Sequence, residues 1–454
     1  MKKAKLGESA FNMVITMTEM FDENVRHTYQ KTAETIYGSP NTPGLATFAY
    51  GSPGRIELIG GDSDADILLV EEKVTEETRR FRKLFKERLS KFNFSKVDIT
   101  GWGSYDDLDV YLGKSLVEGN QILESRFLIG DENVRETVEQ KKRDYNSIER
   151  ELKRIIFNRL YFNQYFRQRI RNGVINIKYC PGGSREFLFV YWHDCLDRMF
   201  SEEPEDQTYQ PRIKVGLERL HKKGKLTKPV LEEVLEAVGF SMVFRSEMLG
   251  VNKTTPDRGL TFLDEATLER LEEVGYVGKE QTIEMFEKYR SMISNVVRLV
   301  WEETIKKLGR LKGIEWENKF RMALDPNYAK NIRHLIPYGE DPLMRTALIW
   351  GASESNQKEL FDYLSNFYRN GADWSTIGSI VCSPLCSPEI LHHIGIGIAK
   401  EKGYGYLLRV IARNKNVKRK TLESIANDPN LEERYTQLAK VALEGGNGTA
   451  NHQV

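Results

Sequence analysis

AYGSPGRIELIGGDSDADILLV, residues 49–70, consists of two apolar segments that are separated by a turn rich in glycine and aspartate. The first segment begins upstream as LATFAY (45–50), and the second is ADILLV (65–70). Short apolar runs that end at glycine or at charged residues are typical of β-strands. We therefore expect two strands here, with a turn that starts at Gly51.

The neighbouring sequence predicts helices and a third strand around this pair. Residues 9–37 and 73–92 have helical spacing, and SKVDIT (95–100) has the character of a strand. Beyond about residue 105 strand signals nearly vanish and long helical patterns dominate. We therefore predict an α+β protein in which a small mixed-sheet domain is followed by mainly α-helical parts.

The last third of the chain contains a faint internal repeat. Recurring helix pairs stack into a solenoid, although an ordinary helical bundle with coincidental spacing remains the alternative. The positions that recur at a spacing of 31 residues are Leu360, Leu391 and Leu422, and Tyr363, Ile394 and Ile425.

Composition shifts along the chain predict four segments. These are an α/β domain (1–137), a helical domain (138–320), a repeat-like helical domain (321–443) and a flexible tail (444–454). The tail is assigned because its residues are polar and rich in glycine.

Charge and cysteine usage restrict the class of protein. The 67 Lys and Arg residues nearly balance the 66 Asp and Glu residues, which argues against a globally basic nucleic-acid binder but still allows a local basic surface. Four cysteines are too few for a disulfide scaffold and fit a reduced compartment. No window approaches the roughly 18 apolar residues of a membrane span, so we expect a cytoplasmic protein with no membrane partner.

Three aspartates and a glycine turn indicate phosphoryl chemistry. Asp64 and Asp66 project from the same face of the second predicted strand, because side chains at i and i+2 do so. Two such carboxylates repel each other unless they hold divalent cations, and Asp98 on the third strand can join them. Gly51 allows close backbone approach, and Ser52 offers a hydroxyl to a phosphate.

This combination resembles the polymerase-β-like nucleotidyltransferase superfamily. GSPGRIE (51–57) followed by SDADILL (63–69) is similar in particular to the nucleotidyltransferase domain of bacterial PII-protein uridylyltransferases. QILESRFLIGDENV (121–134) resembles the helix that follows the catalytic sheet in that family. NIKYCPGGSREFLFVYW (176–192) resembles the family's Asn-x-Lys-x-x-Pro-Gly-Gly-x-Arg block.

The resemblance implies a nucleotidyltransferase that moves a nucleoside monophosphate from an NTP to an acceptor hydroxyl. Gly51 and Ser52 then hold the β- and γ-phosphates, and Asp64 and Asp66 bridge two Mg²⁺ ions, with Mn²⁺ as an alternative. Asp98 binds the metal that activates the acceptor oxygen and helps to remove its proton.

Three basic residues have two interpretations each. Arg55 either contacts a phosphate or braces the domain. Lys178 and Arg185 either reach the nucleotide phosphates from their glycine-rich loop or brace an interface between domains.

The chain departs from the uridylyltransferases beyond these blocks. Their phosphohydrolase domain carries a His…His-Asp…Asp metal set, whereas the sole His-Asp pair here, His193-Asp194, lies in an apolar, aromatic stretch. We expect a structural role for this pair and no removal of the installed nucleotide.

UTP or ATP is the expected donor, and the expected acceptor is a macromolecule, with a protein favoured over RNA. One alternative is the same chemistry on RNA, tRNA or a small molecule. Another is a non-catalytic scaffold that senses nucleotides.

Overall fold

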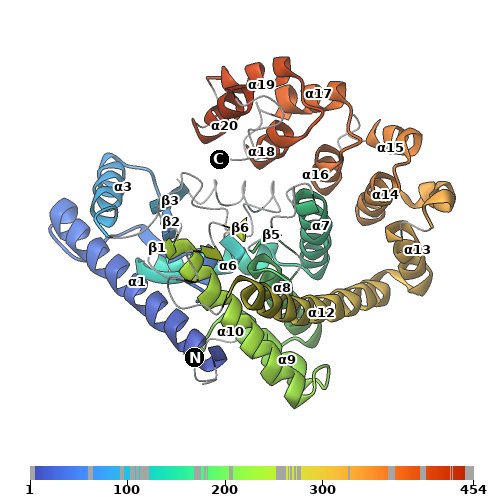
Figure 1. Ribbon diagram of the computed structural model, residues 1–454. Coiled ribbons are helices and arrows are strands. Elements are labelled where there is room, and N and C mark those ends of the chain that lie inside the picture. Colours follow the sequence, from blue (N-terminus) through green and yellow to red (C-terminus); the bar gives the residue numbers. More distant parts are fainter. Residues whose placement is uncertain are drawn as a thin grey trace. The chain divides into compact units, whose positions relative to one another are not determined.

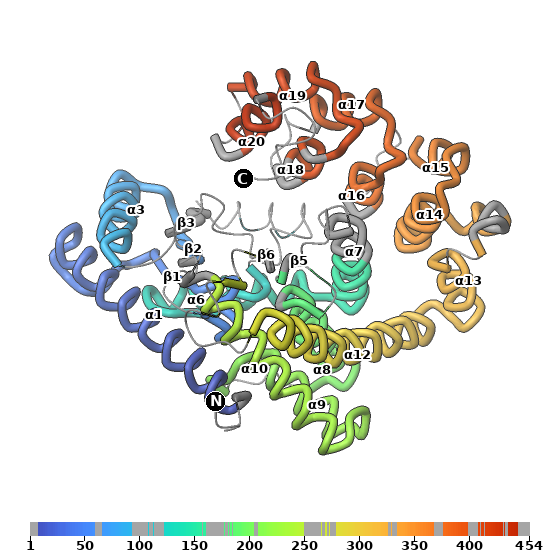
Figure 2. The backbone as a smooth tube through the Cα atoms, viewed as in Figure 1, coloured from blue at the N-terminus to red at the C-terminus, as the bar shows by residue number. Residues whose placement is uncertain are grey.

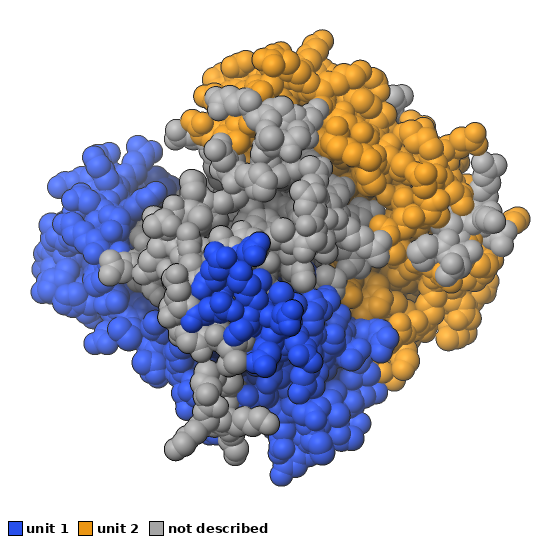
Figure 3. Space-filling model, viewed as in Figure 1, with its two compact units in different colours: residues 1–113, 118–148, 170–300 blue, residues 114–117, 149–169, 301–454 orange. Residues whose placement is uncertain are grey.

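The computed structural model of the chain consists of two compact units, which Figure 3 shows in different colours. Figures 1 and 2 show its helices and strands and the course of its backbone. The first unit contains residues 1–113, 118–148 and 170–300, and the second contains residues 114–117, 149–169 and 301–454. The structure describes residues 6–59, 65–92, 97–102, 108, 112, 122–167, 175–177, 180, 182–203, 208–251, 262, 263, 265, 268, 269, 272, 278–325, 328–366, 374–398, 405–429, 431 and 433–444.

A four-stranded mixed sheet lies in the first unit, in the order β3-β2-β1-β4. Strand β1 is antiparallel to both β2 and β4, whereas β2 and β3 are parallel. Helices dominate the rest of the described chain, which confirms the α+β class. The strands are β1 (Leu45–Ala49), β2 (Ala65–Glu71), β3 (Val97–Trp102) and β4 (Arg126–Gly130).

Strand β4 corrects one expectation from the sequence. Residues 121–134 resemble a helix, but Arg126–Gly130 pairs with β1, and the Asp131 N–H continues this contact by donating to the Leu45 carbonyl at 2.8 Å. Helix α6 (Glu132–Tyr145) begins only afterwards, with Asp131 as its N-cap. The prediction was wrong because the partner of β4 lies about 80 residues away and leaves no trace in local spacing.

The two faces of the sheet are covered by different helices, as the alternation of side chains along a strand requires. Ile67 and Leu69 of β2 face the core that contains helices α1 (Leu6–Tyr37) and α3 (Glu76–Leu89). Leu68 and Val70 face the opposite core, which contains α6. Both α1 and α3 match helices that the sequence predicts.

The helices that follow the sheet along the chain belong to the same unit. Helices α1 and α10 pack together, as do α8 and α9. Helices α8 to α10 share a compact unit with the sheet. The domain boundary at residue 137 stays a prediction. These elements are β5 (Ile175–Asn176), α8 (Phe187–Ser201), α9 (Arg212–Lys222), α10 (Lys228–Val251), β6 (Phe262–Leu263) and most of α12 (Lys279–Lys312).

The second unit is helical in its described part. Within the described chain as a whole, no helix is long and apolar enough to cross a bilayer. The helices of this unit are α7 (Ile148–Arg167), α13 (Ile314–Leu324), η2 (Ala329–Tyr338), α14 (Pro342–Glu354), α15 (Lys358–Ser365), α16 (Trp374–Cys382), α17 (Pro388–Ile398), α18 (Gly405–Arg413), α19 (Arg419–Ala426) and α20 (Glu433–Glu444).

Helices α14 to α19 follow one another as three pairs along the chain, which are α14 with α15, α16 with α17 and α18 with α19. Neighbouring pairs contact each other through equivalent positions. The Ser353 hydroxyl lies 2.6 Å from the Ser383 hydroxyl, 30 residues later in the chain. Asn414, 31 residues further on, donates from Nδ2 to the Ser383 carbonyl at 2.9 Å. Each of these residues lies at or next to the end of the first helix in its pair. The local contact between neighbouring pairs is thus repeated along the chain.

The first helix pair is displaced by one residue relative to the spacing that the sequence suggests. Leu360 is buried as expected, but Tyr363 is 55% exposed and Leu364 is fully buried in its place. The step from the first pair to the second is therefore 30 residues. The step from Leu391 to Leu422, which are both buried, is 31 residues as predicted.

Candidate functional site

The turn after β1 is packed directly against Asp66. Gly51, with φ of +61°, begins the short helix α2 (Gly51–Gly54), and the space that a Cβ atom would need there is filled by the Asp66 carboxylate. The Tyr50 N–H donates to the Asp66 carbonyl at 3.2 Å. Glycine is required at position 51 for two reasons: a side chain would be strained in this conformation and would displace the carboxylate.

Asp66 and Asp98 occupy paired positions on neighbouring strands. Strands β2 and β3 are parallel, and their register aligns Asp66 with Asp98. Paired positions of a parallel ladder lie on the same face of a sheet, about 4.8 Å apart. Asp66 is half-buried and shares its face with Leu68 and Val70. The predicted proximity of the second and third strands is therefore present.

The third predicted carboxylate, Asp64, lies outside the described residues. Within the described part of the chain, no group of three or more His, Cys, Asp or Glu residues is arranged to hold a metal ion. Carboxylate oxygens are ligands that a hard cation accepts, and two residues that carry them, Asp66 and Asp98, occupy paired strand positions.

Ser52 follows Gly51 within the turn and is half-buried. Its carbonyl accepts a hydrogen bond of 2.9 Å from the Glu57 N–H. Gly51 and Ser52 thus belong to one hydrogen-bonded turn that lies beside Asp66, as the motif predicts.

Arg55 is buried between two carboxylates. Its Nε donates to Glu57 Oε2 at 2.9 Å, and one terminal nitrogen donates to Glu124 Oε2 at 2.8 Å. Burial alone would lower the pKa of the guanidinium, but the two carboxylates outweigh it and raise that pKa above its ordinary value. Of the two roles open to Arg55, these contacts correspond to bracing.

The basic residues of the Pro-Gly-Gly block are placed only in part. Lys178 lies outside the described residues, and Arg185 is half-buried in a short 3₁₀ helix, Ser184–Glu186, directly before α8. Gly182 has φ of +78°, and its Cα lies against the Arg290 backbone of α12, where a Cβ would collide. Its N–H donates to Glu186 Oε2 at 2.7 Å. This loop is therefore anchored on α12.

The His193-Asp194 pair lies inside α8 and is buried. Asp194 contacts the guanidinium groups of Arg198 at 2.9 Å and Arg219 at 3.2 Å. Burial raises the pKa of Asp194, whereas Arg198 and Arg219 act in the opposite direction. The carboxylate thus joins α8 to α9.

Sequence reasoning assigned no role to three further residues near the site, although each lies within one of the quoted motifs. Glu57, Glu124 and Trp192 join the turn to α8, since Trp192 Nε1 donates to Glu124 Oε1 at 2.6 Å. Glu57 lies within the GSPGRIE motif, which offered a hint. Glu124 and Trp192 are 68 residues apart and are related only by the fold.

The chain matches no model of a known protein family and no curated protein.

Proposed function

We propose that the protein is a nucleotidyltransferase that moves a nucleoside monophosphate from an NTP to a hydroxyl of a macromolecular acceptor and releases pyrophosphate. The observation that carries the proposal is the packing of the Asp66 carboxylate against Gly51, together with the register pairing of Asp66 and Asp98. A glycine turn beside carboxylates suits an NTP, because the turn accommodates phosphates and the acids hold the accompanying cation.

Each residue of this site has a proposed role. Gly51 and Ser52 contact the β- and γ-phosphates, and Asp98 accepts the proton of the attacking hydroxyl. Asp64, Asp66 and Asp98 hold Mg²⁺, for which Mn²⁺ is an alternative. When bound, the cation neutralises phosphate charge and polarises the phosphoryl group that is transferred.

Lys178 and Arg185 are proposed phosphate contacts, and UTP or ATP is the proposed donor. The support for these two assignments is the resemblance of residues 176–192 to the uridylyltransferase block.

The acceptor is proposed to be a protein. The support is the series of helix pairs from α14 to α19, whose repeated contacts build one continuous helical array. Arrays of this kind present a long surface that suits a macromolecule better than a small molecule.

The test is transfer of label from each α-³²P-NTP, with Mg²⁺ or Mn²⁺, in a cell extract of the source organism. We expect label from UTP or ATP in a band that protease removes and ribonuclease leaves intact. Label in RNA or in a small-molecule fraction would replace the proposed acceptor while the chemistry stands. Binding of NTP without transfer under every condition would contradict the proposal and favour a nucleotide-sensing scaffold.

A further inference from the structure

The turn that carries Gly51 and Ser52 contains a strained residue. Ile56 has φ of 59° and is 1% exposed. This left-handed conformation is sterically disfavoured for a β-branched side chain. Such a residue persists only where its surroundings determine the backbone, and these positions gather at functional sites.

The residues on both sides of Ile56 are held by a buried network. Arg55 bridges the carboxylates of Glu57 and Glu124 through two different nitrogens. The second oxygen of each carboxylate is also used: Glu57 Oε1 accepts from the Ile213 N–H at 3.2 Å, and Glu124 Oε1 accepts from Trp192. The fork of a guanidinium can span two carboxylates in fixed directions, which an ammonium group cannot do.

The backbone of Arg55 connects the turn to α9. The Arg55 N–H donates to the Gly51 carbonyl at 3.2 Å, and the Arg55 carbonyl accepts from the Arg212 N–H at 3.1 Å. Arg212 and Ile213 are the first two residues of α9, so the turn caps that helix. The backbone of Arg55 therefore links Gly51 to α9. The side chain of Arg55 links the same turn to α8, because it binds Glu124, which binds Trp192.

The charge of the network disfavours direct phosphate binding by Arg55. The buried guanidinium of Arg55 already contacts the carboxylates of Glu57 and Glu124. A phosphate that approached Arg55 would have to displace a carboxylate and leave it buried without its cation, which is costly.

We infer that Arg55 is a positioning residue, which acts through Glu57 and Glu124 to hold Gly51 and Ser52 beside Asp66. The inference rests on the proposed nucleotidyl transfer. Loss of the network lets the strained turn relax, and the phosphates are then misaligned with the carboxylates even where they still bind.

The test compares Arg55→Lys and Glu124→Gln, which change the network from opposite sides and retain most of the side-chain volume. We expect both variants of the full-length protein to lower kcat at least about tenfold, with KM for the NTP within about threefold of the wild type. Amide hydrogen exchange across residues 51–57 is expected to become faster in both. Arg135→Lys, which changes an exposed ion pair with Glu132, is the matched control and keeps the wild-type kcat.

Three outcomes would overturn the inference. One is a raised KM with unchanged kcat in Arg55→Lys, together with a lowered KM in Glu124→Gln, because this pattern indicates a phosphate contact. The second is a lower melting temperature with unchanged kcat and KM, which indicates a merely structural role. The third is unchanged hydrogen exchange across residues 51–57 in both variants.

The exchange measurement also separates this inference from the proposed function. If the wild type transfers no nucleotide from any NTP, the proposed function fails. Faster exchange in both variants would still support the role of Arg55 in holding the turn, and unchanged exchange would overturn it.

Discussion

Asp66 on β2 and Asp98 on β3 are register partners in a parallel ladder. This relationship places two acidic positions on one face of the sheet, although 31 residues separate them in the chain. In the proposed site, a bound cation would compensate the charges of two carboxylates at such paired positions.

The first prediction concerns the charge of Asp66. Asp66→Asn is expected to abolish transfer and to leave the melting temperature within a few degrees, because removal of one of two like charges relieves repulsion in the metal-free protein. Glu72→Gln, at an exposed position directly after β2, is the matched control and should keep full activity. Wild-type incorporation of label by Asp66→Asn would exclude the proposed site.

The second prediction separates backbone strain from contact at Gly51. Gly51 and Gly38 have similar left-handed φ values of +61° and +70°, but a Cβ at position 38 meets open space. The left-handed backbone strain alone should therefore cost about 1–2 kcal/mol of stability for alanine at either position. Only Gly51→Ala should also eliminate transfer, because it displaces the Asp66 carboxylate. Equal activity of the two folded variants would show that this contact has no role.

The third prediction concerns His193. His193→Ala is expected to cost about 1–3 kcal/mol of unfolding free energy, because the side chain is buried in α8. The folded variant should still transfer nucleotide, and neither it nor the wild type should release the nucleotide again. His27→Ala, at an exposed position of α1, is the control for chemical denaturation. A metal-dependent release of monophosphate that disappears in His193→Ala would refute the structural role.

The fourth prediction tests the contacts between helix pairs. Asn414 is buried, and its Nδ2 donates to the carbonyls of Val381 at 2.8 Å and Ser383 at 2.9 Å. Asn414→Ala leaves both carbonyls without this donor, so we expect a loss of about 2–3 kcal/mol. Asn427→Ala, at an exposed position after α19, should change stability by less than about 0.5 kcal/mol. Equal denaturation midpoints for the two variants would contradict the importance of this contact.

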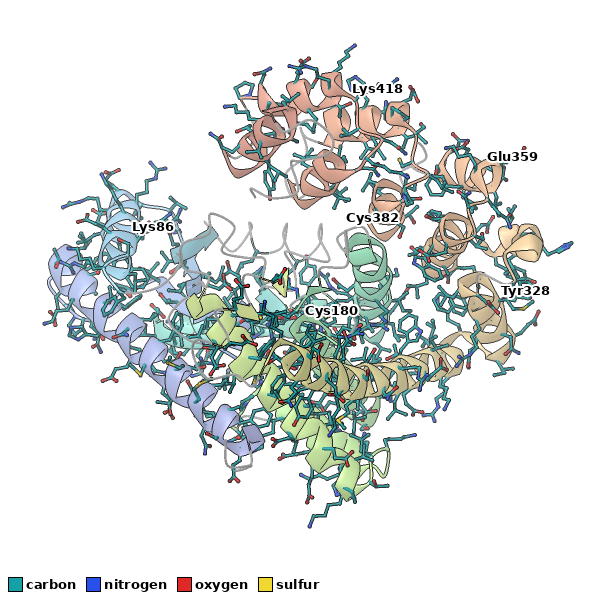
Figure 4. All side chains as sticks on the ribbon, viewed as in Figure 1. Lys86, Cys180, Tyr328, Glu359, Cys382 and Lys418 are labelled. Atoms are coloured by element: carbon teal, nitrogen blue, oxygen red, sulfur yellow. The ribbon has the colours of Figure 1, made fainter. Side chains whose placement is uncertain are left out.

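The fifth prediction uses the four cysteines as reporters of the two units. Burial raises the pKa of Cys180 to about 12, and it raises the pKa values of Cys382 and Cys386 as well. Since only the thiolate is alkylated, these three should resist iodoacetamide at pH 8, and the reactivity of Cys180 should rise with pH toward 12. Half-buried Cys195 should react first. Figure 4 labels Cys180 and Cys382, one in each unit.

Mass spectrometry of peptides after brief labelling measures this order. All four cysteines should react at similar rates in denaturant, which is the internal control. Rapid labelling of Cys180 in the folded protein would contradict its burial.

The sequence predicted the elements around the turn well, for a local reason. Helices α1 and α3 have helical spacing of their apolar residues, whereas strands β1, β2 and β3 are short, largely apolar runs with glycine or charged residues at or near their ends. Residue types and spacing were thus sufficient to predict that Gly51 and Ser52 lie in a turn and that Asp66 and Asp98 lie on neighbouring strands.

Other features depend on contacts between distant residues. Local spacing did not reveal β4, because this strand forms through its hydrogen bonds to β1, which lies far away in the sequence. It also did not reveal that the first helix pair of the C-terminal array is one residue shorter than the next. Leu360, Phe361 and Leu364 are all apolar and all buried, so the sequence does not show which of them is equivalent to a core position of the next pair.

The sequence by itself therefore determined that a glycine turn and acidic strands are present and in which order they occur. The tertiary structure decided that Asp66 lies against Gly51 and that Arg55 is directed into Glu57 and Glu124. The physical reason is that a charged side chain has the same local pattern whether it faces a phosphate, a solvent molecule or a buried carboxylate. Contacts with α8 and α9 hold the carboxylates of Glu124 and Glu57 where Arg55 meets them.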